Sequence, residues 1–214
     1  SVWSAALQKA RAILRPHQRS AVEYMLDRYA SGLTGHFVAM DTGLGKTLTA
    51  LAFVMELLSR GEGARFDRIV WVTPPGTKLE KRASNQSPEN YQLIRNLMRE
   101  LRGPDALVEV PVCFVDKRHP HIALAPPPSQ QLRESGAAPH WEPQICIVHH
   151  DHLRTIVNDI MKVAPRSFFV FDEVDQMYGA SQRTSAALDI AGSCAGFVAQ
   201  TATPIPCSSN MECM

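Results

Sequence analysis

The chain has no long hydrophobic run and no excess charge of one sign, and these absences exclude several classes of protein. No apolar stretch in its 214 residues reaches the ~18 residues that a membrane-spanning helix needs, and no signal peptide opens the sequence. The formal net charge is +1, so any binding of nucleic acid must rest on local basic patches. The content of 45% hydrophobic and 20% charged residues is typical of a soluble globular protein.

Cysteine is scarce, and its spacing matches neither a disulfide framework nor a metal site. The five cysteines stand at positions 113, 146, 194, 207 and 213. Cys146 and Cys194 lie in or beside apolar runs, which predicts buried thiols. This pattern favours a reducing compartment, so we expect an intracellular protein, nuclear or cytoplasmic, with no membrane partner.

Apolar runs typical of buried strands alternate with helical patterns along the chain. The helical patterns begin near Pro16, near Lys46 and at Ser87-Pro88, and one more covers 153–161. The alternation predicts an α/β fold of three layers with a mostly parallel central sheet. Residues 116–143 include three consecutive prolines and predict a surface loop or insertion. The strand candidates are 37–40, 69–72, 112–115, 145–148, 168–171 and 197–199.

The segment 40–47, Met-Asp-Thr-Gly-Leu-Gly-Lys-Thr, is the strongest local signal. A strand, a turn ending in Gly-Lys-Thr and then a helix is the layout of a phosphate-binding loop. Backbone N–H groups at the helix N-terminus cradle phosphates, Lys46 reaches the outer ones, and Thr47 can ligate Mg²⁺. The full pattern has glycine where Met40 stands, and the alternative is a glycine-rich turn that caps a helix. The predicted nucleotide contacts in the loop are Thr42, Gly43, Leu44, Gly45, Lys46 and Thr47.

Acidic residues follow the apolar run 168–171, at the end of a strand where open α/β sheets bind ligands. Asp172 can hold Mg²⁺ through water, opposite Thr47 of the loop. Glu173 can orient or deprotonate the water that attacks a γ-phosphate. The alternative is a solvated acidic turn, which the Gly-Lys-Thr signal upstream makes less favourable.

Two threonines, Thr201 and Thr203, follow the last apolar run, and Pro204 comes directly after them. Their hydroxyls can hydrogen-bond the acidic strand end and relay changes around the γ-phosphate, and a plain polar turn is the alternative. Because Lys46 and Asp172 must meet one Mg²⁺–phosphate group, we expect both to face one pocket. We further expect that Met40 and Phe171 lie at the ends of neighbouring strands.

In their order along the chain, six segments resemble the motifs of superfamily-2 helicases, and most of all those of the Swi/Snf-type branch. There the first motif is LRPYQ-like, the loop is DEMGLGKT-like and the last motif is TGTPI-like. The resemblance extends over about residues 14–206 and implies one RecA-like P-loop NTPase lobe across 1–214, the first of two. Such a lobe couples ATP hydrolysis to movement on, or remodelling of, double-stranded DNA. The segments are 14–18, 41–47, 72–74, 147–153, 172–175 and 201–205.

The resemblance also implies roles for single residues. Gln18 is similar to the adenine-reading glutamine of the family, and Lys46 and Thr47 are similar to its phosphate and Mg²⁺ residues. Asp172 and Glu173 are similar to the metal-holding and water-activating carboxylates. The coupling residues implied are Asp175, Thr201 and Thr203. The residues implied to contact nucleic acid are Thr73, Pro74, Lys78, His149 and His150.

Several positions depart from the family pattern without removing a group needed for hydrolysis. Asp41 and Thr42 replace Glu and Met, His149-His150 replaces Ser-Tyr, Asp175 replaces His and Ala202 replaces Gly. Family members also need a second RecA-like lobe that supplies an arginine finger. No Gln-x-x-Gly-Arg-x-x-Arg pattern occurs in this chain, so we expect that lobe in cis beyond it or in trans.

Other interpretations of the sequence stay open. The lobe can be a nucleotide-dependent binding module without turnover, or the helicase subunit of a restriction or viral DNA-processing enzyme. The run His149 to His152 suggests a metal site, but consecutive side chains at a helix start point in different directions, which favours an exposed helix opening. The cluster of Lys78, Lys81 and Arg82 is either a solvated face or a phosphate contact.

Overall fold

Six parallel strands form one sheet in the order β1-β6-β5-β2-β4-β3. The computed structural model describes residues 2–60, 66–74, 89–102, 112–115, 118, 120, 124, 143–177 and 182–203. The prediction of an α/β fold with a mostly parallel sheet is confirmed. The strands are β1 (Gly35–Ala39), β2 (Arg68–Thr73), β3 (Val112–Phe114), β4 (Gln144–His149), β5 (Ser167–Asp172) and β6 (Gly196–Thr201).

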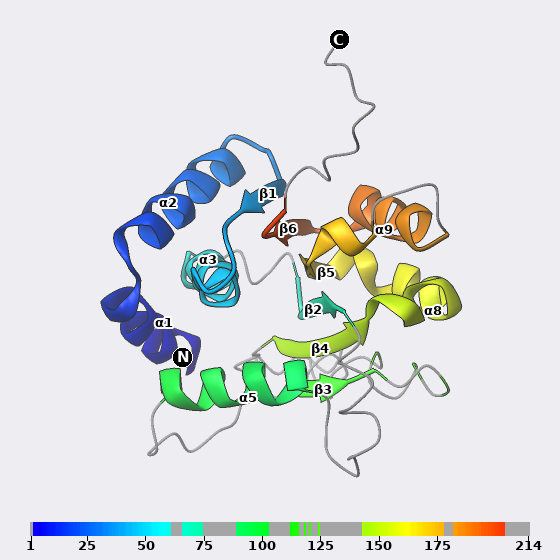
Figure 1. The fold of residues 1–214 in the computed structure, drawn as a ribbon, viewed down its shortest axis with the longest axis horizontal. Helices are drawn as coiled ribbons and strands as arrows, with labels where there is room; N and C mark the ends of the chain where they lie inside the picture. The colour runs from blue at the N-terminus through cyan, green and yellow to red at the C-terminus, as the bar shows by residue number, and fades with distance from the viewer. Residues whose placement is uncertain are drawn as a thin grey trace, which may run out of the picture.

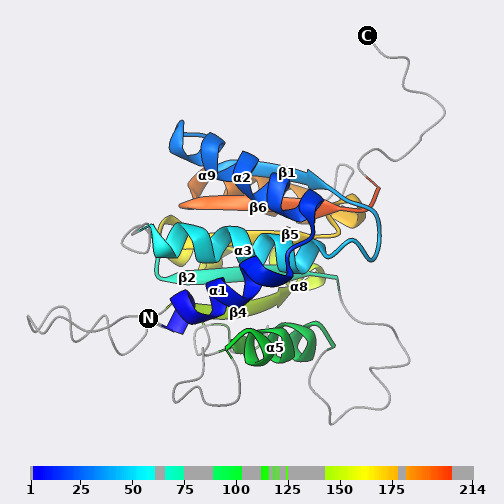
Figure 2. The ribbon, with the colours of Figure 1, turned by 90° about the vertical axis from the view of Figure 1, so that its left-hand side faces the viewer.

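Helices cover both faces of the sheet and complete three layers (Figure 1). Figure 2 shows the helices of one face in front of the strands. None of the helices in the described residues is long and apolar enough to cross a bilayer. One face carries α1 (Val2–Ile13), α2 (Pro16–Ala30), α3 (Lys46–Ser59) and α5 (Glu89–Arg102). The other carries α8 (His150–Val163) and α9 (Gln182–Ser193), with 3-10 turns η2 (Ala164–Arg166) and η3 (Val174–Met177) nearby.

The central strands β2, β4 and β5 are buried on both faces, which explains why they are continuous apolar runs. Every residue of β2 is buried. Ile69 and Trp71 pack toward α3, whereas Val70 and Val72 pack toward α8. Full burial of such a side chain contributes ~1.5–3 kcal/mol, so the central strands hold both helical layers to the sheet.

The helix predictions are confirmed where the structure describes the chain. Pro16 occupies the first turn of α2, where its missing N–H costs nothing, and α3 begins at Lys46. Ser87-Pro88 and nearly all of the proline-rich segment 116–143 lie outside the described residues. The sequence did not predict α1 and α9 as helices.

The prediction that the strands ending near Met40 and Phe171 are neighbours is wrong. Strand β6 lies between them, pairing with β1 on one side and with β5 on the other. The last strand in the sequence is thus inserted beside the first, an order set by tertiary crossovers and not by the local pattern. As a result, the backbone N–H of Met40 donates to the carbonyl of Thr201 at 3.1 Å.

Candidate nucleotide-binding site

The loop between β1 and α3 contains two glycines with left-handed backbone. Gly43 has φ 81° and Gly45 has φ 85°, a region that side chains disfavour. A Cβ on Gly45 would lie 2.3 Å from Nε2 of Gln18, whereas a Cβ on Gly43 would meet nothing within 4 Å. The backbone conformation therefore favours glycine at position 45, and a side chain there would also displace the Gln18 amide.

Gln18, in the first turn of α2, forms hydrogen bonds with the backbone of this loop. Its Oε1 accepts the N–H of Arg15 at 2.8 Å, which caps the helix, and its Nε2 donates to the carbonyls of Leu44 at 3.1 Å and Gly45 at 3.2 Å. The neighbouring His17 places Nε2 3.2 Å from the same Leu44 carbonyl. Because its amide is used by the backbone, Gln18 here shapes the loop, and adenine recognition by it stays a prediction.

Lys46 is the first residue of α3 and its side chain is only 9% exposed. The ammonium lies 3.3 Å from the carbonyl oxygen of Met40 and 3.5 Å from Oε1 of Glu173. The first N–H groups of a helix have no partner within it, and the helix dipole favours negative charge at this end. The loop therefore offers a cation and backbone donors together, the combination that binds phosphate.

The carboxyl end of β5 holds the two acidic residues predicted to act on the nucleotide. Oδ1 of Asp172 accepts the N–H of Glu173 at 3.1 Å and Nε2 of Gln200 at 2.9 Å. Burial raises the pKa of Asp172, although the hydrogen bond from Gln200 opposes this. A desolvated carboxylate gains from a nearby cation, and hard oxygen ligands such as Thr47 Oγ1 and Asp172 suit Mg²⁺.

Glu173 is held in an uncommon backbone conformation. Its φ is 50°, and among the described residues it is the one non-glycine with positive φ. Such strain costs ~1–3 kcal/mol and concentrates at functional sites. The strained turn aims the Glu173 carboxylate at Lys46.

The three coupling residues meet at the end of β6. The hydroxyl of Thr201 donates to Oδ1 of Asp175, and that of Thr203 donates to Oδ2 at 2.9 Å. The N–H of Thr203 also donates to Oγ1 of Thr201 at 3.0 Å. Burial pushes the pKa of Asp175 up, but hydrogen bonds from Thr201 and Thr203, a backbone hydrogen bond and the charge of Lys46 together lower it. The sequence signals at 172–175 and 201–203 thus form one hydrogen-bonded unit.

Sequence reasoning missed two residues of this site. Gln200, which is completely buried, fixes the Asp172 carboxylate, and His17 contacts the loop. Both lie in or beside segments that predicted a functional role, but each comes one position before the residue whose role was predicted, His17 before Gln18 and Gln200 before Thr201. Only the paired geometry of β6 with β5 reveals Gln200, because it is the register partner of Asp172.

The predicted nucleic-acid contacts lie at the same carboxyl edge of the sheet. Thr73 at the end of β2 is the register partner of His149 at the end of β4. Pro74 and His149 are partly exposed, whereas Thr73 and His150 have no exposed surface. A contact through either buried side chain needs a local rearrangement. Lys78 and the rest of the basic cluster lie outside the described residues.

The metal alternative for His149 to His152 finds no support. In the part of the chain that the structure describes, no group of three His, Cys, Asp or Glu side chains is placed to hold an ion. The rings of His149 and His152 lie 5.3 Å apart, and Phe114 contacts His149 edge-on at 4.8 Å. These rings pack as an aromatic cluster beside the strand ends.

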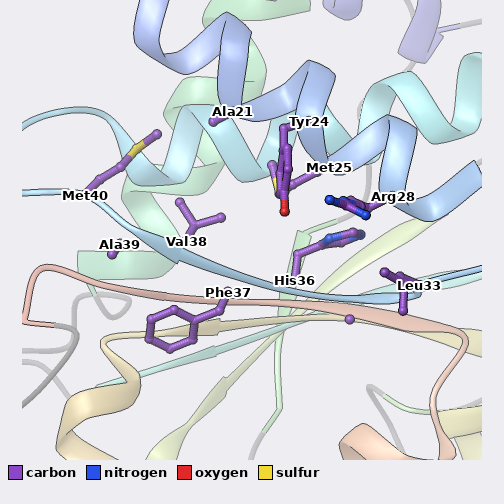
Figure 3. A pocket seen from close by; sticks show the side chains of 11 residues that line it. Ala21, Tyr24, Met25, Arg28, Leu33, His36, Phe37, Val38, Ala39 and Met40 are labelled. Atoms are coloured by element: carbon purple, nitrogen blue, oxygen red, sulfur yellow. The ribbon is translucent and has the colours of Figure 1, made fainter. Parts of the chain in front are cut away.

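A separate hollow of about 490 Å³ lies beside the outer edge of β1, under α2. Figure 3 shows His36 and Val38 pointing toward α2, whereas Phe37 points away from it. The guanidinium of Arg28 lies 5.2 Å from the centroid of the Tyr24 ring beside this hollow. The hollow reaches the loop only at Met40, so it is distinct from the candidate phosphate site at Lys46.

The class of the chain follows from this geometry. A parallel α/β sheet has at one edge a Gly-Lys-Thr loop, an Asp-Glu strand end and a threonine pair hydrogen-bonded to the acidic motif. This combination fits the fold predicted from the sequence, a RecA-like lobe with a phosphate-binding loop.

Comparisons with known sequences agree with this class. The family model described as "Type III restriction enzyme, res subunit" matches residues 11–102. The "DNA repair and recombination protein RAD54" of Oryza sativa subsp. japonica is 41% identical over 68 residues, which cover 28% of this chain and 7% of that protein.

Solved structures share the fold. The "Sulfolobus solfataricus SWI2/SNF2 ATPase core in complex with dsDNA" has a TM-score of 0.56 at 17% identity, over 92% of this chain and 33% of that one. The type ISP restriction-modification enzyme LlaGI with a DNA substrate mimic has a TM-score of 0.55 at 18% identity, over 89% of this chain and 17% of that one. The DUF1998 helicase MrfA bound to DNA and AMPPNP has a TM-score of 0.53 at 20% identity, over 95% of this chain and 26% of that one. The chain is thus similar to helicase-like ATPase domains of the SWI2/SNF2 and restriction-enzyme type, and it spans a third or less of each of these proteins.

Proposed function

We propose that this lobe binds ATP at the carboxyl edge of its sheet and, together with a second lobe, hydrolyses it to drive movement on or remodelling of double-stranded DNA. The observation that carries the proposal is the 3.5 Å contact between Lys46 Nζ and Glu173 Oε1. It supports the proposal because Lys46, the candidate phosphate-binding cation, lies beside Glu173, the candidate base. A γ-phosphate entering there would take over Lys46 and leave Glu173 beside the phosphorus.

The chemistry requires little from the protein beyond positioning and charge. The N–H groups at the start of α3 and Lys46 hold the outer phosphates. Glu173 orients a water molecule and accepts its proton as the water oxygen bonds to the γ-phosphorus and the bond to the β-phosphate oxygen breaks. Thr47 and Asp172 would hold Mg²⁺, which neutralises charge on the phosphate oxygens.

Strand β6 is the element we propose to transmit the state of the nucleotide. It holds Asp172 through Gln200 and Asp175 through Thr201 and Thr203. A shift of either carboxylate on hydrolysis would change hydrogen bonds along a single strand. That strand lies between the loop strand β1 and the acidic strand β5.

We propose the ends of β2 and β4 as the DNA-facing part of the lobe. Pro74 and His149 are partly exposed there, beside the nucleotide edge. Two supporting facts come from the neighbours, since the SWI2/SNF2 core and the helicase MrfA were both solved with DNA. With a net charge of +1, contacts by this lobe have to be local.

We further propose that the second lobe supplies the arginine finger. Arg183 follows the acidic strand, but its guanidinium is paired with Asp151 at 2.9 Å between α9 and α8. A finger is worth ~10³–10⁵ in rate, so a single lobe would lack most of the catalytic power.

The test is steady-state ATP hydrolysis by the complete gene product, with and without double-stranded DNA. We expect turnover that rises with DNA and disappears in Lys46→Ala. ATP binding without turnover in the presence of DNA would favour the rival function, a nucleotide-dependent binding module. No nucleotide binding at all would reject both.

A further inference from the structure

Two cysteine thiols lie side by side at the edge of the sheet opposite the nucleotide loop. Cys113 on the edge strand β3 and Cys146 on β4 are direct register partners. The Cys113 thiol donates to Sγ of Cys146 with a sulfur–sulfur distance of 3.4 Å. Neither cysteine is in a disulfide, Cys113 is half-buried and Cys146 is buried.

The spacing of neighbouring strands is compatible with a covalent link between them. Neighbouring strands lie ~4.7–4.9 Å apart, which is within the ~4.4–6.8 Å that separates the Cα atoms of bonded cysteines. Both side chains point to the α8 face of the sheet, where they belong to one apolar cluster. Rotation of the side chains is therefore enough to bring the sulfurs to bonding distance.

Polar neighbours favour a thiolate in this pair. Nε2 of Gln144 lies 3.1 Å from Sγ of Cys146 and 3.9 Å from Sγ of Cys113. Gln144 is the register partner of Arg68, whose side chain is buried on β2. The hydrogen bond from Cys113 lowers the pKa of Cys146, burial opposes this, and Gln144 and Arg68 lower it further, while the same bond and burial raise the pKa of Cys113. The hydrogen bond provides a path for a proton between the two sulfurs, and thiolate is the reactive form of cysteine.

Cys194 provides a contrast in the same molecule. Its sulfur lies near two backbone carbonyl oxygens, of Ala191 at 3.6 Å and of Gly196 at 3.4 Å. Burial raises its pKa to about 11. Among the described residues, no thiol or cation is recorded beside it as Cys113 and Arg68 are beside Cys146.

We propose that Cys113 and Cys146 are an oxidisable dithiol, which a peroxide converts to a disulfide that clamps β3 to β4. The proton passes to Cys146 along the hydrogen bond, and the partly exposed Cys113 sulfur attacks a peroxide oxygen. The O–O bond breaks, an S–O bond forms, and the departing hydroxide takes a proton from the solvent to become water. Cys146 then attacks the Cys113 sulfenic acid, the S–O bond breaks, and the hydroxide leaves as water with the Cys146 proton. Two sulfurs are oxidised by two electrons in all, and one peroxide is reduced to two waters.

The clamp would fix an edge of the sheet that is otherwise held weakly. Strand β3 has three residues, and it pairs on one side only, with β4. The link would close a loop between positions 33 apart in sequence, which restricts the unfolded chain. We therefore expect oxidation to raise the melting temperature and reduction to restore it.

The experiment uses the chain with Cys194, Cys207 and Cys213 changed to Ser, treated with hydrogen peroxide under native conditions and in urea. We expect the native protein to lose the mass of two hydrogens, to yield a peptide linked through Cys113 and Cys146, and to regain both thiols with dithiothreitol. The controls Cys113→Ser and Cys146→Ser in this background should give no linked peptide.

Peptide mapping of the oxidised wild-type chain keeps the test independent of folding defects in the variants. A Cys113–Cys146 link formed faster in the native chain than in urea supports the proposal. Oxygen adducts on Cys113 without the link, a link through Cys194 instead, or equal rates in urea would overturn it.

Discussion

Lys46 Nζ and Glu173 Oε1 lie 3.5 Å apart, although the strands that position them are separated by β6. Lys46 follows β1 and Glu173 follows β5, so the two side chains meet across the intervening strand β6 although β1 and β5 are not hydrogen-bonded to each other. Their side chains are 9% and 31% exposed, so the pair is partly shielded from water. A phosphate would replace Glu173 as the anionic partner of Lys46, which frees the carboxylate for the attacking water.

Glu173→Gln should preserve nucleotide binding and abolish turnover in the complete gene product. The amide keeps the size and part of the hydrogen bonding but cannot accept a proton, and general-base catalysis contributes ~10²–10⁴ in rate. Steady-state hydrolysis with DNA present checks this, with Glu100→Gln on the exposed face of α5 as the matched control. Hydrolysis at the parental rate would mean that another residue is the base.

Gly45→Ala should be more harmful than Gly43→Ala, although both have positive φ. The left-handed backbone alone costs a side chain ~1–2 kcal/mol, and only at Gly45 does the added Cβ also collide with Gln18, at 2.3 Å. Urea unfolding and ATP affinity of both variants measure the difference.

The collision can be separated from the backbone strain by a double-mutant cycle. Gln18→Ala removes the colliding amide, so the Gly45→Ala cost should shrink in that background while the Gly43→Ala cost stays constant. Equal costs for Gly45→Ala in both backgrounds would show that Gln18 does not pack against the loop.

The strands could be predicted from sequence because a parallel sheet is buried on both faces and its strands are continuous apolar runs. Helix α1 buries Trp3, Ala6, Leu7 and Ala10 at helical spacing, but alanines make this stripe inconspicuous. Helix α9 buries only Ala186 and Ile190, too few to set a period.

The motif residues could be predicted because their chemistry is local. The position of β6 could not, because strand order depends on crossovers between distant segments. Gln200 was missed for the same reason, since its role exists only through the pairing of β6 with β5.

Stability should fall as the pH falls from 7 to 5, largely through His150. Burial lowers the pKa of this completely buried imidazole to about 4, against ~6.5 in an unfolded chain. Between these values the unfolded state binds a proton that the folded state does not, so the free energy of unfolding decreases as acid is added. The expected loss from His150 is about 2 kcal/mol at pH 5.

Urea unfolding at both pH values, with wild type and His150→Gln, checks this sign and size. The free energy of unfolding of His150→Gln should fall less than that of the wild type between pH 7 and 5, because the glutamine amide does not titrate. Buried His36, whose pKa burial also lowers, retains a contribution of the same sign in both proteins. Identical losses in the two proteins would contradict a neutral, buried His150.

The chain studied alone should hydrolyse ATP very slowly, even with double-stranded DNA present. The proposed second lobe would supply the arginine finger, and Arg183 of this chain is paired with Asp151. The assay compares turnover of the 214-residue chain with that of the complete gene product. Robust DNA-stimulated turnover by the chain alone would show that it supplies or assembles its own finger.

The most direct test of the nucleotide site is a calorimetric titration of Mg²⁺–ATP into the wild-type chain, Lys46→Ala and Lys162→Ala. Lys162 is an exposed lysine of α8 paired with Asp159, so it controls for the loss of any ammonium. We predict that Lys46→Ala weakens binding by about 1–3 kcal/mol, the scale of hydrogen bonds to charged groups, while Lys162→Ala binds as wild type does. Equal affinity of all three proteins would contradict a phosphate site at Lys46.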